Sequence, residues 1–280
     1  MLNQFEITGG SVTGRDHKHI EKNNQDAWTW IKTDDVLIAV VADGCGSSKH
    51  SEVGAKFGVK IVCQTIYKIL YDPEYEHLSP IYPEFWNLVQ NQCLEMLTCC
   101  FKAMGGSKSE TVNDFFLFTL IGVVISGNSV VTFGIGDGHV YVNGKPNKIG
   151  PFPNNEPPYL AYNLVETSLK DADPSLLRFQ IHNIEWIDEV NSILLATDGL
   201  DDLIRAENKK MPGKEESVGP VSQFWEEDRY FKNPDMVRRR LFLINRDLSQ
   251  INWEARKVSK ENGHLADDTT IVVIRRCGNG

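Results

Sequence analysis

The feature that most constrains this chain is an apolar run that ends on a carboxylate. Residues 36–42, VLIAVVA, are seven consecutive apolar residues, and Asp43-Gly44 follows them directly. A run of this length and composition predicts a buried strand. The same construction recurs where VVTFGIG precedes Asp137-Gly138 and where ILLAT precedes Asp198-Gly199. The fold must therefore bring carboxylates to the ends of several core strands.

The length of 280 residues allows one large domain or two small ones, but no repeat or linker marks a boundary, so we expect one globular domain that covers residues 1–280. The formal net charge is −9, and no basic block has the size that nucleic-acid binding needs. The first residues lack the pattern of a signal peptide, and no apolar run reaches the length of a membrane span. Six cysteines without CxxC spacing are typical of free thiols in a reducing compartment. We therefore expect a cytoplasmic protein that binds neither nucleic acid nor membrane.

Hydrophobic periodicity predicts strands that come in runs, interrupted by three helices. This order favours an α+β fold with a mostly antiparallel sheet. Two stretches, 144–175 and 207–232, are expected to be irregular. The strands are expected near residues 5–12, 26–32, 36–42, 115–126, 129–135, 138–143, 179–187, 192–197 and 269–276, and the helices at 50–70, at 84–102 and from Asn233-Pro234-Asp235 towards residue 260.

The acidic strand ends do not all fit a simple turn. Asp-Gly usually marks a hairpin, and we expect one at Asp137-Gly138 because HVYVN follows as a second strand. Asp43-Gly44 and Asp198-Gly199 precede helical patterns, so neither closes a hairpin. Acidic residues also stand beside strands in NNQDAW (23–28) and ADDTTIVVI (266–274). Five separate segments therefore each bring a carboxylate to the edge of a strand.

Clustered carboxylates need a counter-charge. At the end of a core they repel one another and resist desolvation unless they are protonated or matched by cations. The five segments carry no Arg or Lys beside their acidic tips. Hard divalent ions with oxygen ligands, Mg²⁺ or Mn²⁺, are the natural match, and the absence of His/Cys spacing argues against zinc. The signatures of a P-loop, a dinucleotide loop and a nucleophile elbow are missing.

Taken in order, NNQDAW, VVADGCGS, FGIGDGHVYV, LLATDGLDD and DDTTIVVI resemble the motifs of the metal-dependent serine/threonine protein phosphatases of the 2C family. The resemblance spans residues 10 to 275, and His17 with the NQDA form is similar to a bacterial-type branch. It implies a four-layer αββα sandwich with two antiparallel sheets flanked by helices. It also implies a signalling enzyme that hydrolyses phosphoserine or phosphothreonine in proteins, with a hydroxide bridging two Mn²⁺ or Mg²⁺ ions and a third ion in many members.

The resemblance assigns roles residue by residue. Asp43 resembles the carboxylate that bridges two ions, and Gly44 a carbonyl ligand. Asp198 and Asp267 resemble the remaining ligands. The resemblance places four further positions around the metals. Asp26 resembles the residue that orients a metal-bound water, and Gln25 stands where the family usually has Glu. Asp137 and Asp202 resemble residues that help to hold the third ion. Residues 144–175 would form the flap.

Departures from the family pattern leave several roles open. Glu21 stands where an Arg commonly binds the substrate phosphate, which makes Lys22 and His17 the candidate substrate-binding residues. Cys45 follows Asp-Gly where some members have His, and Asp268 stands where Asn is usual. The general acid stays open among three histidines and a metal-bound water; the histidines are His17, His19 and His50. Two other functions also stay open: a pseudophosphatase that binds phosphoprotein without turnover, and a metal-dependent phosphatase of small metabolites.

Overall fold

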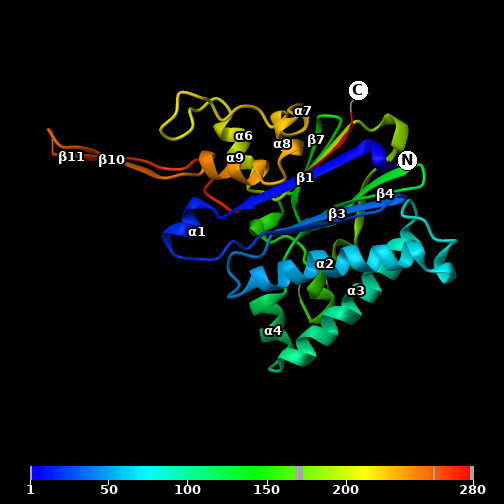
Figure 1. Cartoon of the computed structure of the whole chain (residues 1–280). Helices are drawn as coiled ribbons and strands as arrows, with labels where there is room; N and C mark the ends of the chain where they lie inside the picture. The colour runs from blue at the N-terminus through cyan, green and yellow to red at the C-terminus, as the bar shows by residue number, and fades with distance from the viewer. Residues whose placement is uncertain (1, 168, 170–172, 255, 278–280) are drawn as a thin grey trace.

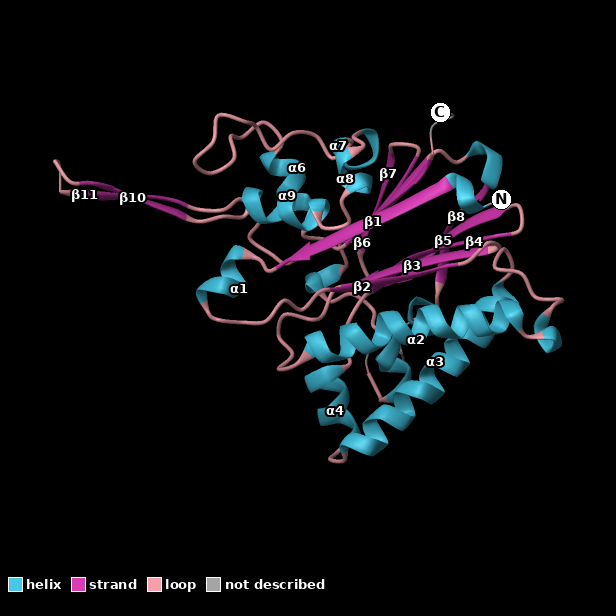
Figure 2. Cartoon of the chain, in the orientation of Figure 1, coloured by secondary structure: helices cyan, strands magenta, loops and turns pink. Residues whose placement is uncertain are grey.

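The computed structural model describes residues 2–167, 169, 173–254 and 256–277. Two five-stranded antiparallel sheets lie at its centre, and helices cover both outer faces (Figures 1 and 2). This arrangement confirms the predicted αββα sandwich. The first sheet contains, in spatial order, β1 (Phe5–Val12), β12 (Thr269–Arg276), β9 (Ser192–Ala196), β6 (Gly138–Val142) and β7 (Lys145–Ile149). The second contains β2 (Ala27–Lys32), β3 (Val36–Ala42), β4 (Leu120–Ser126), β5 (Ser129–Ile135) and β8 (Gln180–Trp186).

The helices form two separate layers. Those that cover the second sheet are α2 (Ser51–Tyr71), α3 (Pro83–Met104) and α4 (Lys108–Phe115). Those that cover the first are α6 (Leu200–Ala206), α7 (Gln223–Glu226), α8 (Arg229–Lys232) and α9 (Met236–Ile244). A short α1 (Arg15–His19) and the two-stranded hairpin of β10 (Leu248–Asn252) and β11 (Lys257–Glu261) lie at one end. Short 3-10 turns span Leu2–Gln4, Pro73–Tyr75, Pro153–Asn155, Leu160–Leu164, Pro174–Leu177 and Ile187–Glu189.

The seven-residue apolar run becomes β3, which is buried on both faces. Val36, Ile38 and Val40 join a core cluster beneath α2 and α3, whereas Leu37 and Val41 join the cluster between the two sheets. Because side chains alternate across a strand, only an uninterrupted apolar run can serve both layers. A third cluster lies between the first sheet and its helices.

Every predicted strand is present, but three segments between them differ from expectation. The third helix ends at Ile244, because the side chain of the next residue, Asn245, bonds to Thr13 O and Leu265 N, and Leu248–Asn252 then forms a strand of a hairpin. The expected strand at 115–126 begins at Leu120, since residues 108–115 form α4 behind a cap. The supposedly irregular stretches also contain β7, α7 and α8.

The cap of α4 carries a sequence signal that explains why the strand expected at 115–126 begins only at Leu120. The Ser107 hydroxyl accepts a hydrogen bond from Glu110 N at 3.3 Å and donates one to Glu110 Oε2 at 2.7 Å. The sequence SKSE has the spacing of a capping box, and the first of these bonds is its N-cap half; the Glu110 carboxylate accepts from the Ser107 hydroxyl rather than from the Ser107 backbone N–H.

The predicted hairpin at Asp137-Gly138 is wrong. β5 pairs with β4 and β8 in the second sheet, whereas β6 pairs with β7 and β9 in the first. The turn therefore carries the chain from one sheet to the other, and Gly136 and Gly138 adopt positive φ angles of 92° and 146° there. Asp137 is consequently placed at the edge where the two sheets meet.

Two further expectations concern the whole chain. The six cysteines are all unpaired, as predicted for free thiols. No helix among the described residues combines the length and apolar character needed to cross a membrane.

Candidate metal centre

The five acidic segments meet at one edge of the sandwich. Asp43 directly follows β3, and Asp198 lies just beyond the end of β9. Asp26 directly precedes β2, and Asp267 lies just before β12. Because neighbouring strands run antiparallel, the end of one and the start of the next lie at the same edge. Both sheets therefore contribute carboxylates to a single place.

A cleft of about 400 Å³ opens at this edge. Seven of the residues singled out from the sequence line it: His17, Asp43, Gly44, Cys45, Asp137, Asp198 and Asp267. The segment 154–157 and Tyr159 form another part of its wall, so the expected flap region does lie beside the acidic residues. The cleft thus combines a carboxylate floor with a wall that comes from an irregular loop.

The carboxylates in the cleft share an unfavourable electrostatic environment. Burial, and then the charges of Asp26 and Asp198, raise the pKa of Asp43 well above its usual range. Burial and the neighbouring Asp267 raise the pKa of Asp198 to about 7. The pKa values of Asp137 and Asp267 are also raised, chiefly by burial. Among the described residues, no Lys or Arg forms an ion pair with any of these side chains, and the charges of Lys148 near Asp137 and His17 near Asp267 offset the effect of burial only in part.

Asp26 and Gln25 lie beneath the cleft and are almost completely buried. Asp26 Oδ2 accepts a hydrogen bond from Thr197 Oγ1 at 2.8 Å, whereas its Oδ1 has no partner. Gln25 Nε2 donates to Ser51 Oγ and to Cys45 O, the latter at 3.2 Å, and Gln25 Oε1 has no partner. A buried polar atom without a partner is unfavourable by about 1–3 kcal/mol. Two such oxygen atoms are available here to a cation or to water molecules around one.

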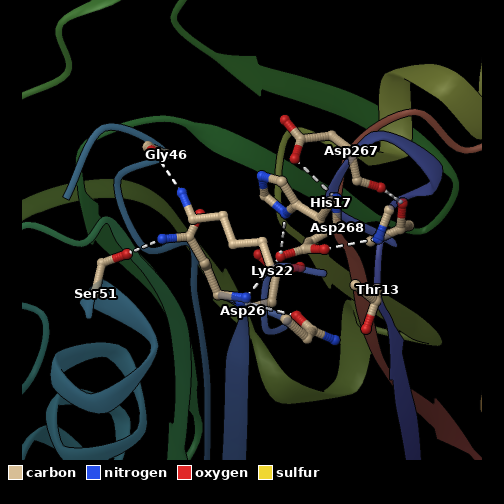
Figure 3. Close-up of polar contacts among 12 residues, drawn as sticks. Thr13, His17, Lys22, Asp26, Gly46, Ser51, Asp267 and Asp268 are labelled. Atoms are coloured by element: carbon tan, nitrogen blue, oxygen red, sulfur yellow. Dashed lines mark hydrogen bonds and ion pairs between the residues drawn. The ribbon is translucent and has the colours of Figure 1, made fainter. Parts of the chain in front are cut away.

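Asp268 ties the loop before β12 to the N-terminal segment (Figure 3). Its Oδ1 accepts a hydrogen bond from Gly14 N at 2.7 Å, and its Oδ2 accepts one from Gln25 N at 2.6 Å. His17 Nδ1 lies 3.0 Å from the same Oδ2, at ion-pair distance when the imidazole is protonated. Because both carboxylate oxygens are engaged, Asp268 positions its neighbours rather than offering a free ligand atom.

Close backbone packing also holds the loop before β12 against the N-terminal segment. A Cβ atom at Gly14 would lie 2.4 Å from Asp267 C, and one at Gly199 would lie 2.0 Å from Asp268 O. No side chain fits at either position without displacing the acidic loop. These two glycines therefore let the start of α1 and the start of α6 pack directly against the backbone of residues 267–268.

Asp202 and Lys22 are not among the residues that line the cleft. Asp202 Oδ2 accepts hydrogen bonds from Ala266 N at 2.6 Å and Asp267 N at 3.1 Å, and its Oδ1 contacts Arg205. The carboxylate thus holds the backbone that carries Asp267. Lys22 donates from Nζ to Gly46 O, so it spans from the segment before β2 to the rim of the cleft (Figure 3).

Sequence reasoning missed several groups that support the site. Thr197 and Ser51 hold Asp26 and Gln25 through their hydroxyls, and the positioning role of Asp268 was visible only as a departure from a pattern. Cys45 also lies in the cleft wall. Burial raises the pKa of the Cys45 thiol, whereas hydrogen bonds with Ser47 and Tyr159 lower it. Together the hydrogen bonds outweigh burial, so the pKa lies below its usual value. Proximity in sequence to Asp43, Asp198 and Asp267 could have indicated Cys45, Thr197 and Asp268, whereas nothing in the sequence indicated Ser51.

Comparison with solved structures shows where this fold occurs. A solved bacterial serine phosphatase aligns over 99% of this chain and 99% of its own, with 16% identity and a TM-score of 0.50. A serine-threonine phosphatase 2C from Toxoplasma gondii aligns over 97% of this chain and 95% of its own, with 12% identity and a TM-score of 0.50. Identities this low show a shared fold and nothing finer.

The family itself follows from the sequence. The model of the family described as protein phosphatase 2C matches residues 13–236. The chain therefore belongs to the protein phosphatase 2C family, as the order of its motifs predicts. A search of curated protein sequences finds no match.

Proposed function

We propose that this chain is a divalent-metal-dependent phosphatase that hydrolyses phosphoserine and phosphothreonine in proteins. The observation that carries the proposal is the cleft in which Asp43, Asp198 and Asp267 converge without a basic partner among the described residues. Membership of the protein phosphatase 2C family supports the same reaction. Two oxygen-binding ions, Mg²⁺ or Mn²⁺, would match the charge and the donor atoms of this site.

The residues that would hold the ions are those that line the cleft. Asp43 would be shared between two ions, Gly44 would contribute its carbonyl oxygen, and Asp198 and Asp267 would complete the set. Asp137 lies in the same cleft and would help to hold a third ion. When bound, such ions activate water as a nucleophile and neutralise the oxygens of a phosphate.

The buried residues beneath the cleft would act through water. Asp26 Oδ1 and Gln25 Oε1 are the two unpartnered oxygens, and both can accept hydrogen bonds. Asp26 would orient the attacking water, and Gln25 would ligate or contact the second ion without adding charge. Asp202 would act as a positioning residue, because it holds the backbone of Asp267.

The leaving oxygen of a serine or threonine needs a proton. His17 lines the cleft, and its Nδ1 lies against the Asp268 carboxylate. Its other ring nitrogen therefore points away from Asp268 (Figure 3). We therefore favour His17 over His19, which lies 3.3 Å from Asp247 outside the cleft. Lys22, at the rim beside Gly46, and the flap residues 154–157 would contact the phosphoprotein.

The test is a comparison of substrates with and without metal. After exhaustive treatment with EDTA, we expect no hydrolysis of a phosphoserine peptide or of 4-nitrophenyl phosphate. Added Mn²⁺ or Mg²⁺ should restore both activities. Full turnover in EDTA would contradict the proposal. Faster hydrolysis of sugar phosphates than of phosphopeptides would instead favour a phosphatase of small metabolites.

The neutral Gln25 also favours a second candidate, a pseudophosphatase. Its amide is hydrogen-bonded to Ser51 and Cys45 and brings no negative charge to the site. Such a protein would bind phosphoprotein yet release no phosphate from either substrate at any concentration of Mn²⁺. Release of phosphate that depends on the cleft carboxylates excludes this alternative.

A further inference from the structure

The hairpin of β10 and β11 projects from the body of the molecule (Figures 1 and 2). Its two strands pair only with each other, so neither belongs to either main sheet. An isolated two-stranded hairpin is marginally stable in water and gains stability when one face packs against something. The hairpin therefore needs an explanation beyond its own hydrogen bonds.

The two faces of the hairpin differ. Leu248 packs over Gly213, and Glu261 Oε2 accepts a hydrogen bond from Gly213 N at 3.0 Å. These contacts anchor one face at its root. Ile251 and Val258 are directly paired on the opposite face, where they are 53% and 60% exposed. The second face is thus apolar and uncovered.

The tip adds the most exposed large apolar side chain on the described part of the protein. Trp253 follows β10 and is 79% exposed. Tryptophan supplies much of the binding energy in protein–protein interfaces because it buries a large area with few rotatable bonds. A contiguous apolar patch on a projecting element marks a site of interaction with another macromolecule.

The charge of the hairpin indicates the kind of partner. Residues 248–261 carry three basic side chains, Arg256, Lys257 and Lys260, against two acidic ones, whereas the whole chain has a net charge of −9. Within the described chain, none of the three basic side chains has a carboxylate at ion-pair distance. A partner with acidic residues around an apolar contact would match this surface.

The root of the hairpin is joined to the cleft. Asn245 donates from Nδ2 to Thr13 O at 2.9 Å and accepts from Leu265 N at 3.1 Å. Asp247 accepts from Gly263 N at 2.7 Å and lies 3.3 Å from His19. The segment that returns from β11 leads directly to Asp267. A molecule held by the hairpin is therefore held at the end of the sandwich that carries the cleft.

We propose that the β10–β11 hairpin is a docking arm for an acidic phosphoprotein substrate, which it binds through Ile251, Trp253 and Val258. This inference rests on the proposed function and deepens it. Phosphorylated segments carry about −2 per phosphate at neutral pH, which suits the three unpaired basic residues. A second copy of this chain fits less well, because a two-fold contact of hairpin against hairpin would place like charges opposite each other.

The experiment compares a docking variant with a matched control. The docking variant replaces Ile251, Trp253 and Val258 by Ser. The control is Trp186→Ser, because Trp186 is 66% exposed at the end of β8, away from the hairpin. Phosphorylated casein serves as the acidic phosphoprotein, and 4-nitrophenyl phosphate reports the cleft alone.

We expect the docking variant to raise KM for phosphorylated casein by about tenfold, the effect of losing an aromatic anchor at an interface. Its kcat for casein and its kcat/KM for 4-nitrophenyl phosphate should match the wild type, and Trp186→Ser should change neither substrate. Binding of casein in EDTA, measured without turnover, should weaken by the same factor.

Three outcomes would overturn the proposal. The first is equal KM and equal binding for the docking variant and the wild type. The second is binding of the wild type, but not of the variant, to vesicles of phosphatidylcholine and phosphatidylserine, which would make the hairpin a membrane contact. The third is a dimer that only the wild type forms. Because casein binding in EDTA needs no catalysis, it decides the role of the hairpin even if the chain hydrolyses neither substrate.

Discussion

The cleft and the β10–β11 hairpin each invert the usual distribution of side chains, but in opposite ways. The cleft gathers carboxylates in a partly buried place, where their charges repel one another. The hairpin exposes large apolar side chains to solvent. Each arrangement is unfavourable for the isolated chain. The comparison teaches that each surface is costly by itself, and that the proposed ligands, cations in the cleft and an acidic protein at the hairpin, would relieve that cost.

The two regions should respond differently to substitution, and activity gives the largest contrast. We expect Asp43→Asn to lower phosphatase activity by roughly 10²–10³-fold, as loss of a key electrostatic group does. The fold should remain intact, because one of several repelling charges is removed. Phosphate release from 4-nitrophenyl phosphate in Mn²⁺ is the measurement, with exposed Asp35→Asn as the control. Unchanged activity would remove Asp43 from the ligand set.

A second prediction separates proton transfer from the rest of the cleft. His17→Asn should slow hydrolysis of a phosphoserine peptide by about 10²-fold, within the range of general acid catalysis. Hydrolysis of 4-nitrophenyl phosphate should change little, because nitrophenolate leaves without a proton. His19→Asn, outside the cleft, is the matched control. An equal loss with both substrates would assign His17 to binding or structure instead.

A third prediction concerns stability without metal. The folded-state pKa of Asp198, about 7, lies above its ordinary value of 3.8. The folded protein therefore binds the Asp198 proton more tightly than the unfolded chain does. The resulting contribution to the free energy of unfolding is fully present below about pH 4 and is lost as pH rises through 7. In EDTA we expect the free energy of unfolding to fall by on the order of 2 kcal/mol across this range, after allowance for solvent screening.

Urea unfolding in EDTA at several pH values measures this trend. Asp198→Asn should flatten it, and added Mn²⁺ at pH 7 should raise stability by binding the folded state. A metal-free protein whose stability rises steadily from pH 4 to 7 would show that the cleft carboxylates do not strain the fold.

A fourth prediction tests whether the charge of the cleft sets its affinity for ions. Gln25→Glu adds one negative charge beside the unpartnered oxygens. We expect the Mn²⁺ concentration for half-maximal activity to fall by about tenfold, which corresponds to ~1.4 kcal/mol. A rate titration against Mn²⁺ for the wild type, Gln25→Glu and Gln25→Ala provides the measurement. Superimposable wild-type and Glu curves would show that position 25 does not govern ion affinity.

The smallest effect is expected at the hairpin. Trp253→Ser should change the free energy of unfolding by less than about 0.5 kcal/mol, as for other exposed positions. The side chain is mostly in solvent, so its removal leaves no cavity. Urea unfolding beside Trp186→Ser is the measurement. A large loss of stability would show that Trp253 packs within the protein, and the contrast between hairpin and cleft would then fail.

Local patterns in the sequence determined most of the fold. The apolar run 36–42 predicts a buried strand, and β3 is buried; the structure adds that its alternating side chains serve two layers. Strand ends that carry carboxylates predict an acidic edge, and Asp43, Asp137, Asp198 and Asp267 do line one cleft. These predictions succeed because they depend on periodicity and on the order of the motifs along the chain.

Only the tertiary structure decided which strands pair and which side chains support the site. Asp137-Gly138 resembles a hairpin turn locally, yet its two strands belong to different sheets, because pairing depends on distant β4, β8 and β9. Asp268 reaches Gly14 and Gln25 across more than 240 residues of sequence. No local pattern encodes such contacts. They arise when both sheets pack together, and packing also leaves the hairpin outside.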